Sequence, residues 1–492
     1  MTSTPHSQSL SPSETQQGLR LVIREGMATQ SMIILTSGAL LVALALKLGA
    51  TYLQIGIITS VPLFSNVFQI VSIYLVQRWN QRKKVVVLCT LMGRTAYLFI
   101  ALVPFLGSSD YGIYVIMVAL VLQHGLGAVS NGSWSSWMRD LIPHQTMGDF
   151  FSRRLAIVQT LSIFLSIATV LLLNQTEERG GQAELYLYGS FFLVGSLAGI
   201  LGSYFLSKTP EPVYQPEVTP LLSLIKLPFN HANFRRLMMY MASWNFAVNL
   251  ATPFFTVYLL QTLGFSMAYV IGLTTLTQIF NVFFFRLWGR YADRYSNKTV
   301  LSICAPLYLL CIVSMVFTTL PNVHQGTLPL LIVLHAVMGV ATAGTGLASG
   351  SIGLKLAPRQ QSVAYLSMLS FTNSLASGVA PILGGWLAGH LVDASWSWNV
   401  ALGLPPNGSV ALVSLQHWDF LFVMAFVAGG FALYRLHRLQ EEGNALRWVS
   451  VRSQLKGLQQ RRKLRSTARS LSSLTVGPQM ESTTPDDQIL SQ

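Results

Sequence analysis

The most restrictive feature of the sequence is a pair of long uncharged runs on either side of one charged turn. No residue from Leu237 to Phe285 carries a charge, and none does from Thr299 to Thr319. The hydrocarbon core of a bilayer is about 30 Å thick, and about 20 apolar residues of helix cross it. The turn between the runs, Gly289 to Lys298, therefore joins two membrane-spanning helices. Its Arg and Lys residues predict that it faces the cytoplasm.

The distribution of charge places the rest of the chain relative to the same membrane. Only 10% of the 492 residues are charged, whereas a soluble protein carries about 25%, which indicates an integral membrane protein. The formal charge of +14 would by itself suggest a nucleic-acid partner. However, only Lys47 and Arg179 fall in loops assigned to the outside, Arg94 lies within a predicted span, and every other Arg and Lys faces the cytoplasm. This alternation predicts an even number of spans with both termini in the cytoplasm, and it excludes a nucleic-acid partner.

The apolar runs predict an all-α membrane protein with twelve transmembrane helices in two six-helix bundles. The bundles occupy residues 20–207 and 237–437, and a proline-rich cytoplasmic linker, 208–236, joins them. We expect a disordered cytoplasmic tail over 1–19 and a basic cytoplasmic tail over 438–492, which either lies on the anionic inner leaflet or is solvated. The predicted spans are 27–46, 52–76, 85–106, 111–133, 155–173 and 185–207, then two within 237–285, and finally 299–320, 328–354, 362–390 and 418–434.

An internal repeat links the two predicted bundles. Several landmarks recur with a shared offset of 215 residues, as parallel six-span repeats would. The matching pairs are Asn66 and Asn281, Cys89 and Cys304, Pro143 and Pro358, and Leu48-Gly49 and Leu263-Gly264. The three cysteines, Cys89, Cys304 and Cys311, lie in apolar runs without metal-ligand spacing, so we expect them to be small buried hydrophobes.

The charged turn has a recognisable pattern, Gly-x-x-x-Asp-Arg-x-x-x-Lys, formed by Gly289, Asp293, Arg294 and Lys298. This pattern between two spans resembles the signature of the major facilitator superfamily of transporters. The resemblance implies alternating access, a Gly that lets helices approach closely, and an Asp that faces the start of a helix in the same half. With Arg290, these residues are the predicted cytoplasmic gate. A solvated basic loop that only sets topology is the alternative.

The segment from Trp137 to Arg154 resembles the connection between the fourth and fifth helices of the same family. There, Asp140 with Arg153 and Arg154 is a candidate ionic latch on the cytoplasmic side. The alternative is a solvated loop, because exposed ion pairs contribute only about 0–1 kcal/mol.

Polar side chains within the spans are candidates for the transport path, because such groups are costly in lipid unless they face a cavity or another helix. The candidate substrate-lining residues are Gln30, His124, Trp244, Asn245, Asn249, Gln278, His335 and Asn373. Asn245 and Asn249 share one helix face. The alternative for each is a structural hydrogen bond between helices, which we favour for Asn66 and Asn281.

Charged residues inside the predicted spans are rare. No Asp or Glu lies deep in any of them, so a proton-coupled cycle would need His124 or His335 to titrate. For Arg94 we favour pairing with helix dipoles or carbonyls over binding an anion. In the eleventh span, the run Gly378 to Gly385 predicts a bent and closely packed helix.

These observations predict a secondary active or facilitative transporter in the plasma membrane that moves a small solute. The uncharged, amide- and aromatic-rich lining fits a neutral or amphiphilic solute. The sequence contains no catalytic constellation and no cofactor or metal motif, so we do not expect an enzyme. Expected partners are the bilayer, a small molecule and, for a coupled cycle, protons, with the chain a monomer. Proton-driven drug or metabolite efflux and a non-transporting receptor or scaffold are the alternatives.

Overall fold

The computed structural model describes residues 11–69, 71, 75, 78–79, 81–105, 111–143, 147–177, 181–212, 228–319, 326–358, 362–401 and 409–441. We call residues 11–212 the first half and residues 228–441 the second half. Helices of the first half are α1 (Pro12–Thr36), α2 (Ala39–Lys47), α3 (Tyr52–Phe64), η1 (Ser65–Phe68), α5 (Arg82–Leu102), η2 (Val103–Phe105), α6 (Gly112–Leu141), α7 (Met147–Glu177) and α8 (Gly181–Lys208).

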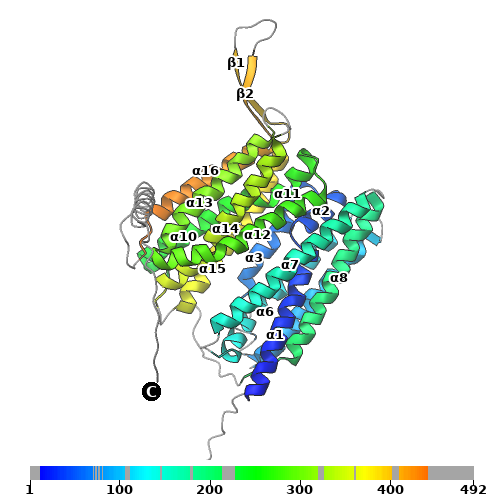
Figure 1. Ribbon diagram of the computed structural model, residues 1–492, viewed down its shortest axis with the longest axis vertical. Coiled ribbons are helices and arrows are strands. Elements are labelled where there is room, and N and C mark those ends of the chain that lie inside the picture. Colours follow the sequence, from blue (N-terminus) through cyan, green and yellow to red (C-terminus); the bar gives the residue numbers. More distant parts are fainter. Residues whose placement is uncertain are drawn as a thin grey trace, which may run out of the picture. The chain divides into compact units, whose positions relative to one another are not determined.

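The second half is also helical except for one hairpin. Its helices are α10 (Ala232–Ala251), η3 (Thr252–Phe254), α11 (Phe255–Val257), η4 (Tyr258–Thr262), α12 (Met267–Arg294), α13 (Asn297–Ser314), η5 (Met315–Thr318), α14 (Thr327–Leu356), α15 (Ser362–His390) and α16 (Trp418–His437). The hairpin pairs β1 (Ser395–Ala401) with β2 (Ser409–Gln416) in antiparallel register and projects beyond the helices in Figure 1. The predicted spans 362–390 and 418–434 leave this segment on the outer side of the membrane, but its strands were not predicted.

Within the described residues, ten helices are long and apolar enough to cross a membrane, which agrees with an integral membrane protein. Two of the twelve predicted spans are not among the ten. The second is described only as the shorter helix Tyr52–Phe68. The seventh overlaps α10, which begins earlier, at Ala232, and carries Arg235 and Arg236 there. This helix ends at Ala251, where the chain changes to a 3-10 turn around Pro253. The full set of twelve spans remains a prediction.

The start of the first helix corrects the sequence analysis. Residues 12–19, expected to belong to a disordered tail, form the first turns of α1. Ser11 and Glu14 make a reciprocal capping box there, which satisfies free backbone N–H groups at the helix start. As a consequence, Glu25 lies in the middle of a helix rather than in front of one. Residues 1–10, most of the linker (213–227) and most of the basic tail (442–492) lie outside the described residues.

The repeat found in the sequence is also present in the packing. In the first half α1 packs on α8, α5 on α6 and α5 on α8; in the second half α10 packs on α16, α13 on α14 and α13 on α16. The helix interruptions follow the same repeat. The predicted first span breaks at Ser37 and Gly38, where Gly38 has φ 60°, and the predicted seventh breaks at Thr252 and Pro253. Each position in the second pair lies 215 residues after its counterpart.

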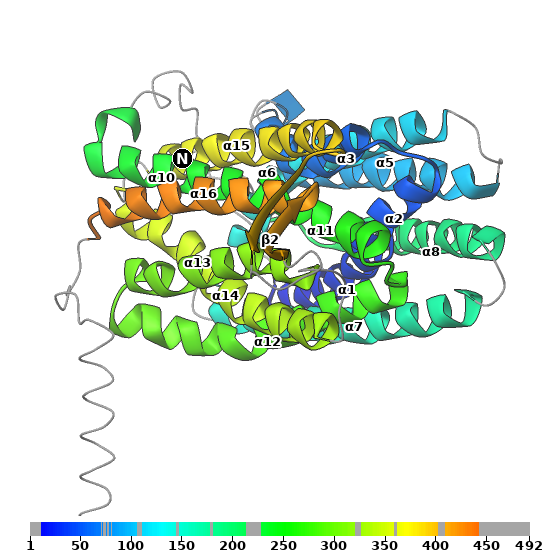
Figure 2. The same ribbon diagram turned by 90° about the horizontal axis from the view of Figure 1, so that it is seen from above.

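The two halves meet through α3 with α15 and α7 with α12, and through α2 with α11 and α12 (Figures 1 and 2). At the end predicted to face outward, the Tyr52 hydroxyl donates to the Gln261 side-chain oxygen over 3.2 Å. A side chain on Gly385 would collide with the Tyr52 carbonyl oxygen, and one on Gly56 would collide with that of Pro381. These approaches confirm the predicted close packing of the Gly378 to Gly385 run.

Candidate functional site

A cavity of about 520 Å³ lies between the two halves, among α3, η1, α10, α14 and α15. Three of the predicted lining residues, Trp244, Asn245 and Asn373, line it. The other residues that line it are Leu63, Asn66, Met241, Thr345, Gly346, Ser349, Gly350, Leu366, Leu369, Ser370, Ser374 and Ser377. Among these described residues none is charged. The cavity is thus a neutral site that combines amide, hydroxyl and apolar groups.

The amide groups of the cavity differ in how far the protein satisfies them. The Asn245 side-chain nitrogen donates to the Met241 carbonyl over 2.8 Å, which leaves its oxygen as a free acceptor among the described residues. The Asn373 side-chain oxygen is buried and accepts no hydrogen bond there. Trp244 is only 7% exposed, and its ring lies against Tyr308 with centroids 6.2 Å apart.

Five of the predicted lining residues do not line this cavity: Gln30, His124, Asn249, Gln278 and His335. The Asn249 amide donates to the Asn245 carbonyl over 2.8 Å. His124 lies 3.4 Å from the Tyr97 hydroxyl through Nε2, and Nδ1 of the buried His335 lies 2.9 Å from the Leu331 carbonyl oxygen. These contacts fit the structural alternative for the two histidines.

The repeated asparagines divide between the two roles. The Asn281 amide donates to the Thr342 hydroxyl over 3.0 Å, so it joins α12 to α14 as favoured. Its counterpart Asn66 instead lines the cavity.

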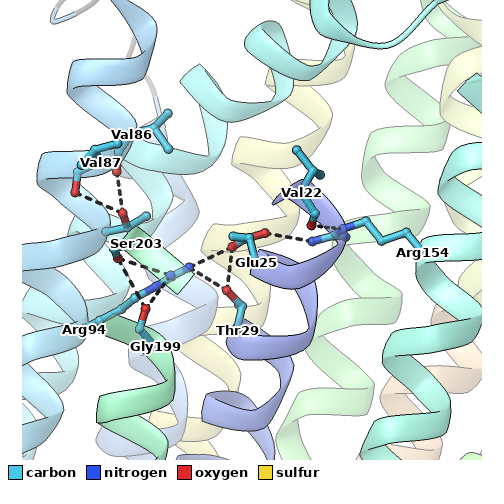
Figure 3. A network of polar contacts seen from close by, with 10 residues as sticks. Val22, Glu25, Thr29, Val86, Val87, Arg94, Arg154, Gly199 and Ser203 are labelled. Carbon is cyan, nitrogen blue, oxygen red and sulfur yellow. Dashed lines mark hydrogen bonds and ion pairs between the residues drawn. The ribbon is translucent and has the colours of Figure 1, made fainter. Parts of the chain in front are cut away.

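A charged cluster inside the first half was missed by the sequence analysis (Figure 3). The Glu25 carboxylate on α1, whose side chain is 5% exposed, accepts from Arg94 on α5 over 3.1 Å and from Arg154 on α7 over 3.2 Å. Thr29, one turn along α1, donates to Glu25 over 2.6 Å and accepts from Arg94 over 2.8 Å. One carboxylate therefore ties three helices together.

Arg94 also makes the contact with backbone that was predicted for it. Its Nη1 donates to the Gly199 carbonyl on α8 over 2.8 Å and to the Ser203 hydroxyl over 3.3 Å. However, an acidic residue is buried beside the predicted first span: Glu25, two residues before the predicted start, is 4% exposed and lies in the same continuous helix α1. The Ser11-to-Glu14 capping box was the signal that could have extended α1 and placed Glu25 inside it.

The signature turn is shorter than the sequence suggested, because α12 continues through Arg294 and α13 begins at Asn297. Asp293 is exposed, and its carboxylate makes no hydrogen bond or ion pair with any residue that the structure describes. Gly289 does not make an unusually close approach, since an added Cβ would lie 3.5 Å from Leu347 Cδ1. Arg290 and Arg294 are exposed too, and the Arg294 guanidinium lies 5.5 Å from the Tyr295 ring centre.

The carboxylate at a helix start that was expected of Asp293 is supplied in this structure by another residue. Glu441, three residues after Arg438, accepts from the Lys298 backbone N–H over 2.8 Å and from the Asn297 side chain over 3.0 Å. Lys298 Nζ in turn donates to the Leu439 carbonyl over 2.7 Å. Glu441 therefore caps the N-terminus of α13, where the helix dipole favours a negative charge.

The first half repeats this arrangement with Glu211. Its carboxylate accepts from the backbone N–H of Arg82 over 2.9 Å and of Lys83 over 3.2 Å, at the start of α5. The Arg82 side chain is fully buried and also pairs with Asp140 over 2.5 Å. Asp140 thus pairs with Arg82, and Arg154 pairs with Glu25, so the predicted pairing of Asp140 with Arg153 and Arg154 is not made in this structure.

The cysteines behave as predicted: Cys89, Cys304 and Cys311 are free and buried. Among the residues that the structure describes, no group of three His, Cys, Asp or Glu side chains is placed to hold a metal ion.

Comparisons with known proteins agree with the helical membrane architecture described above. The sequence pattern of a family described as the Major Facilitator Superfamily matches residues 26–325 and 273–468. The chain is 29% identical over 126 residues to the rubrofusarin-specific efflux pump aurT of Gibberella zeae, which is 25% of this chain and 21% of that protein. The chain thus aligns with about a fifth of that relative's length.

Solved structures share the fold over most of the chain. The nucleoside transporter NupG superimposes with a TM-score of 0.61 at 15% identity, covering 87% of this chain and 99% of that one. A D-xylose-proton symporter gives 0.60 at 14% identity, with coverages of 87% and 97%. A bacterial homologue of the human lysosomal transporter Spinster, solved inward-facing and unoccupied, gives 0.60 at 13% identity, with coverages of 88% and 98%.

Proposed function

The chain belongs to the major facilitator superfamily, and on that premise we propose that it carries a small solute across the membrane by alternating access. Family and fold neighbours are transporters, which supports membrane transport rather than catalysis. The main observation in favour of alternating access is the neutral cavity, which is lined by residues of both halves. A solute bound there contacts both halves, so their relative movement can transfer it.

The positions of the contacts support a conformer that is open toward the cytoplasm. Contacts at the predicted outer end, such as Tyr52 with Gln261, close that side. The cavity instead reaches Gly350 near the end of α14 and Leu366 near the start of α15, both at the predicted cytoplasmic side. We therefore assign this structure to the inward-open state of the cycle, with both termini in the cytoplasm.

In this state the predicted gate is open. Asp293 is exposed and has no partner among the described residues. This is expected of a gate residue that forms its interaction only in the opposite conformer, in which the cytoplasmic side is closed. We propose that closure of the cytoplasmic side gives this carboxylate a helix start or a cation to bind. Such an interaction contributes about 0.3–1 kcal/mol when exposed and up to about 2 kcal/mol when partly buried.

The test is Asp293→Asn in protein reconstituted into vesicles. We expect the initial transport rate to fall about three- to tenfold, because losing about 0.7–1.4 kcal/mol changes an equilibrium by that factor. Membrane insertion and the melting temperature should stay unchanged, because the side chain has no partner to lose in the inward-open state. Asp393→Asn, an exposed carboxylate at the opposite end, is the matched control. Unchanged transport in the Asp293 variant would contradict the gating role.

A further inference from the structure

We propose that the cavity binds an uncharged ring compound bearing hydroxyl or carbonyl groups, with Gly346 and Gly350 providing room for the ring. The proposal rests on the cavity's being the transport site proposed above, and it adds the chemical class of the solute. Three features of the cavity support this class: free hydrogen-bonding groups, glycines that border open space, and described lining residues that carry no charge.

The cavity presents more hydrogen-bonding groups than the protein uses. The side-chain oxygens of Asn245 and Asn373 have no donor among the described residues, and neither do the hydroxyls of Ser349 and Ser370 have a partner there. The Trp244 indole N–H likewise has no acceptor in that part of the chain. Of these groups only the Asn373 oxygen is buried from solvent, where an unpaired polar group is costly. The other groups are open to the cavity, and a solute with hydroxyl or carbonyl groups would replace water as their hydrogen-bond partner.

The glycines of α14 fall into two classes. Gly339 and Gly344 are packing glycines, because an added Cβ would collide with the Thr277 carbonyl oxygen and with the Cys304 sulfur respectively. Gly346 and Gly350, which line the cavity, would place a Cβ in open space with no atom within 4 Å. Glycines four apart usually let two helices approach closely. Here they border empty volume instead, which fits a flat ring lying against the helix backbone.

The described lining also selects against charge. None of its residues is charged, so an ionic group would lose water on closure of the halves without gaining a counter-ion. The volume of about 520 Å³ lies within the range of small-molecule pockets. Trp244, which lines the cavity although it is largely buried, adds an aromatic side chain to the lining beside the amides and hydroxyls.

The experiment measures binding to the purified full-length protein in detergent by calorimetry, using matched pairs of probes. Adenosine is compared with adenosine monophosphate, and nitrophenyl β-D-glucoside with nitrophenyl β-D-glucuronide, so that each pair differs in charge. Methyl β-D-glucoside tests whether a sugar ring suffices without an aromatic one. We expect at least one neutral probe to bind about tenfold or more tightly than its charged partner.

The matched variants are Gly346→Leu and Gly430→Leu. Both glycines are helical, and both would place a Cβ in open space, but only Gly346 lines the cavity. We expect Gly346→Leu to weaken binding of the neutral probe about tenfold or more, with Gly430→Leu unchanged. The melting temperatures of both variants without ligand show that each is folded.

Three results would overturn the proposal: no neutral probe binds, a charged probe binds as tightly as its neutral partner, or Gly346→Leu leaves binding intact. Flux of the bound probe into vesicles is measured separately. Binding as expected without flux would refute alternating access while leaving the solute class standing, so the two failures are distinguishable.

Discussion

At equivalent positions of the repeat, the first half has charged or polar side chains where the second half has aromatic or aliphatic ones. Four residues around the buried cluster of the first half can be compared with those 215 positions later. The pairs are Glu25 and Tyr240, Thr29 and Trp244, Arg94 and Leu309, and Arg154 and Leu369. In the first half they form an ionic network across α1, α5 and α7. In the second half the same positions are aromatic or aliphatic, and two of them, Trp244 and Leu369, line the cavity.

The packing is retained although the chemistry differs. Arg94 reaches the Gly199 carbonyl of α8, and an added Cβ on Gly199 would lie 3.3 Å from Arg94 Cδ. In the second half Leu309 packs directly on Gly429 of α16. In each half, a side chain of one helix (Arg94 of α5, Leu309 of α13) thus fills the space beside a glycine of the half's final helix (α8 or α16). Buried ion pairs therefore join the helices of the first half, which contributes little to the cavity. The second half forms most of the cavity and has uncharged residues at the equivalent positions.

The most severe test of this comparison is Glu25→Gln, which leaves two guanidiniums without a counter-charge. Removing one partner of a buried ion pair costs about 3–5 kcal/mol, so we expect a large fall in the melting temperature of the purified protein. The triple variant Glu25→Tyr, Arg94→Leu and Arg154→Leu carries the second half's residues and should recover much of the loss. A Glu25→Gln protein as stable as the parent would show that the cluster does not hold these helices together.

A smaller effect is expected from the amides of α10. Asn245→Leu removes a cavity acceptor, and we expect it to weaken binding of a neutral probe by about 1–1.5 kcal/mol, or about tenfold. Asn249→Leu is its matched control, because Asn249 lies one turn away and does not line the cavity. Calorimetry of both variants decides the point. Equal losses would mean that these positions affect helix structure rather than the site.

The smallest effect is expected at Tyr240, the counterpart of Glu25. Its hydroxyl is buried and makes no hydrogen bond with the described residues, so Tyr240→Phe should change the free energy of unfolding by less than about 0.5 kcal/mol or increase it. Tyr258→Phe is the contrasting control, because that hydroxyl contacts Thr318; its loss should cost about 1 kcal/mol. A marked loss in the Tyr240 variant would reveal an unrecognised polar role at this position.

The features that could be predicted from the sequence are those encoded by short stretches of the chain. Hydropathy located the helices, and polar side chains inside spans identified Trp244, Asn245 and Asn373 as lining residues. Glu25 was missed because hydropathy placed the start of the first helix too late. Glu211 and Glu441 were missed for a different reason: their partners lie more than a hundred residues away, at the starts of α5 and α13. No local pattern encodes such a contact, so only the folded chain reveals it.

Glu441 has a practical consequence for handling the protein. Its carboxylate is only 6% exposed and holds the first turn of α13, although it lies beyond the last predicted span. Judged by hydropathy alone, the chain could be truncated just after Arg438 to remove the basic tail. A shortened version, or one carrying a fluorescent fusion, should retain the residues through Glu441. Without them the start of α13 loses the carboxylate that accepts from the Lys298 N–H.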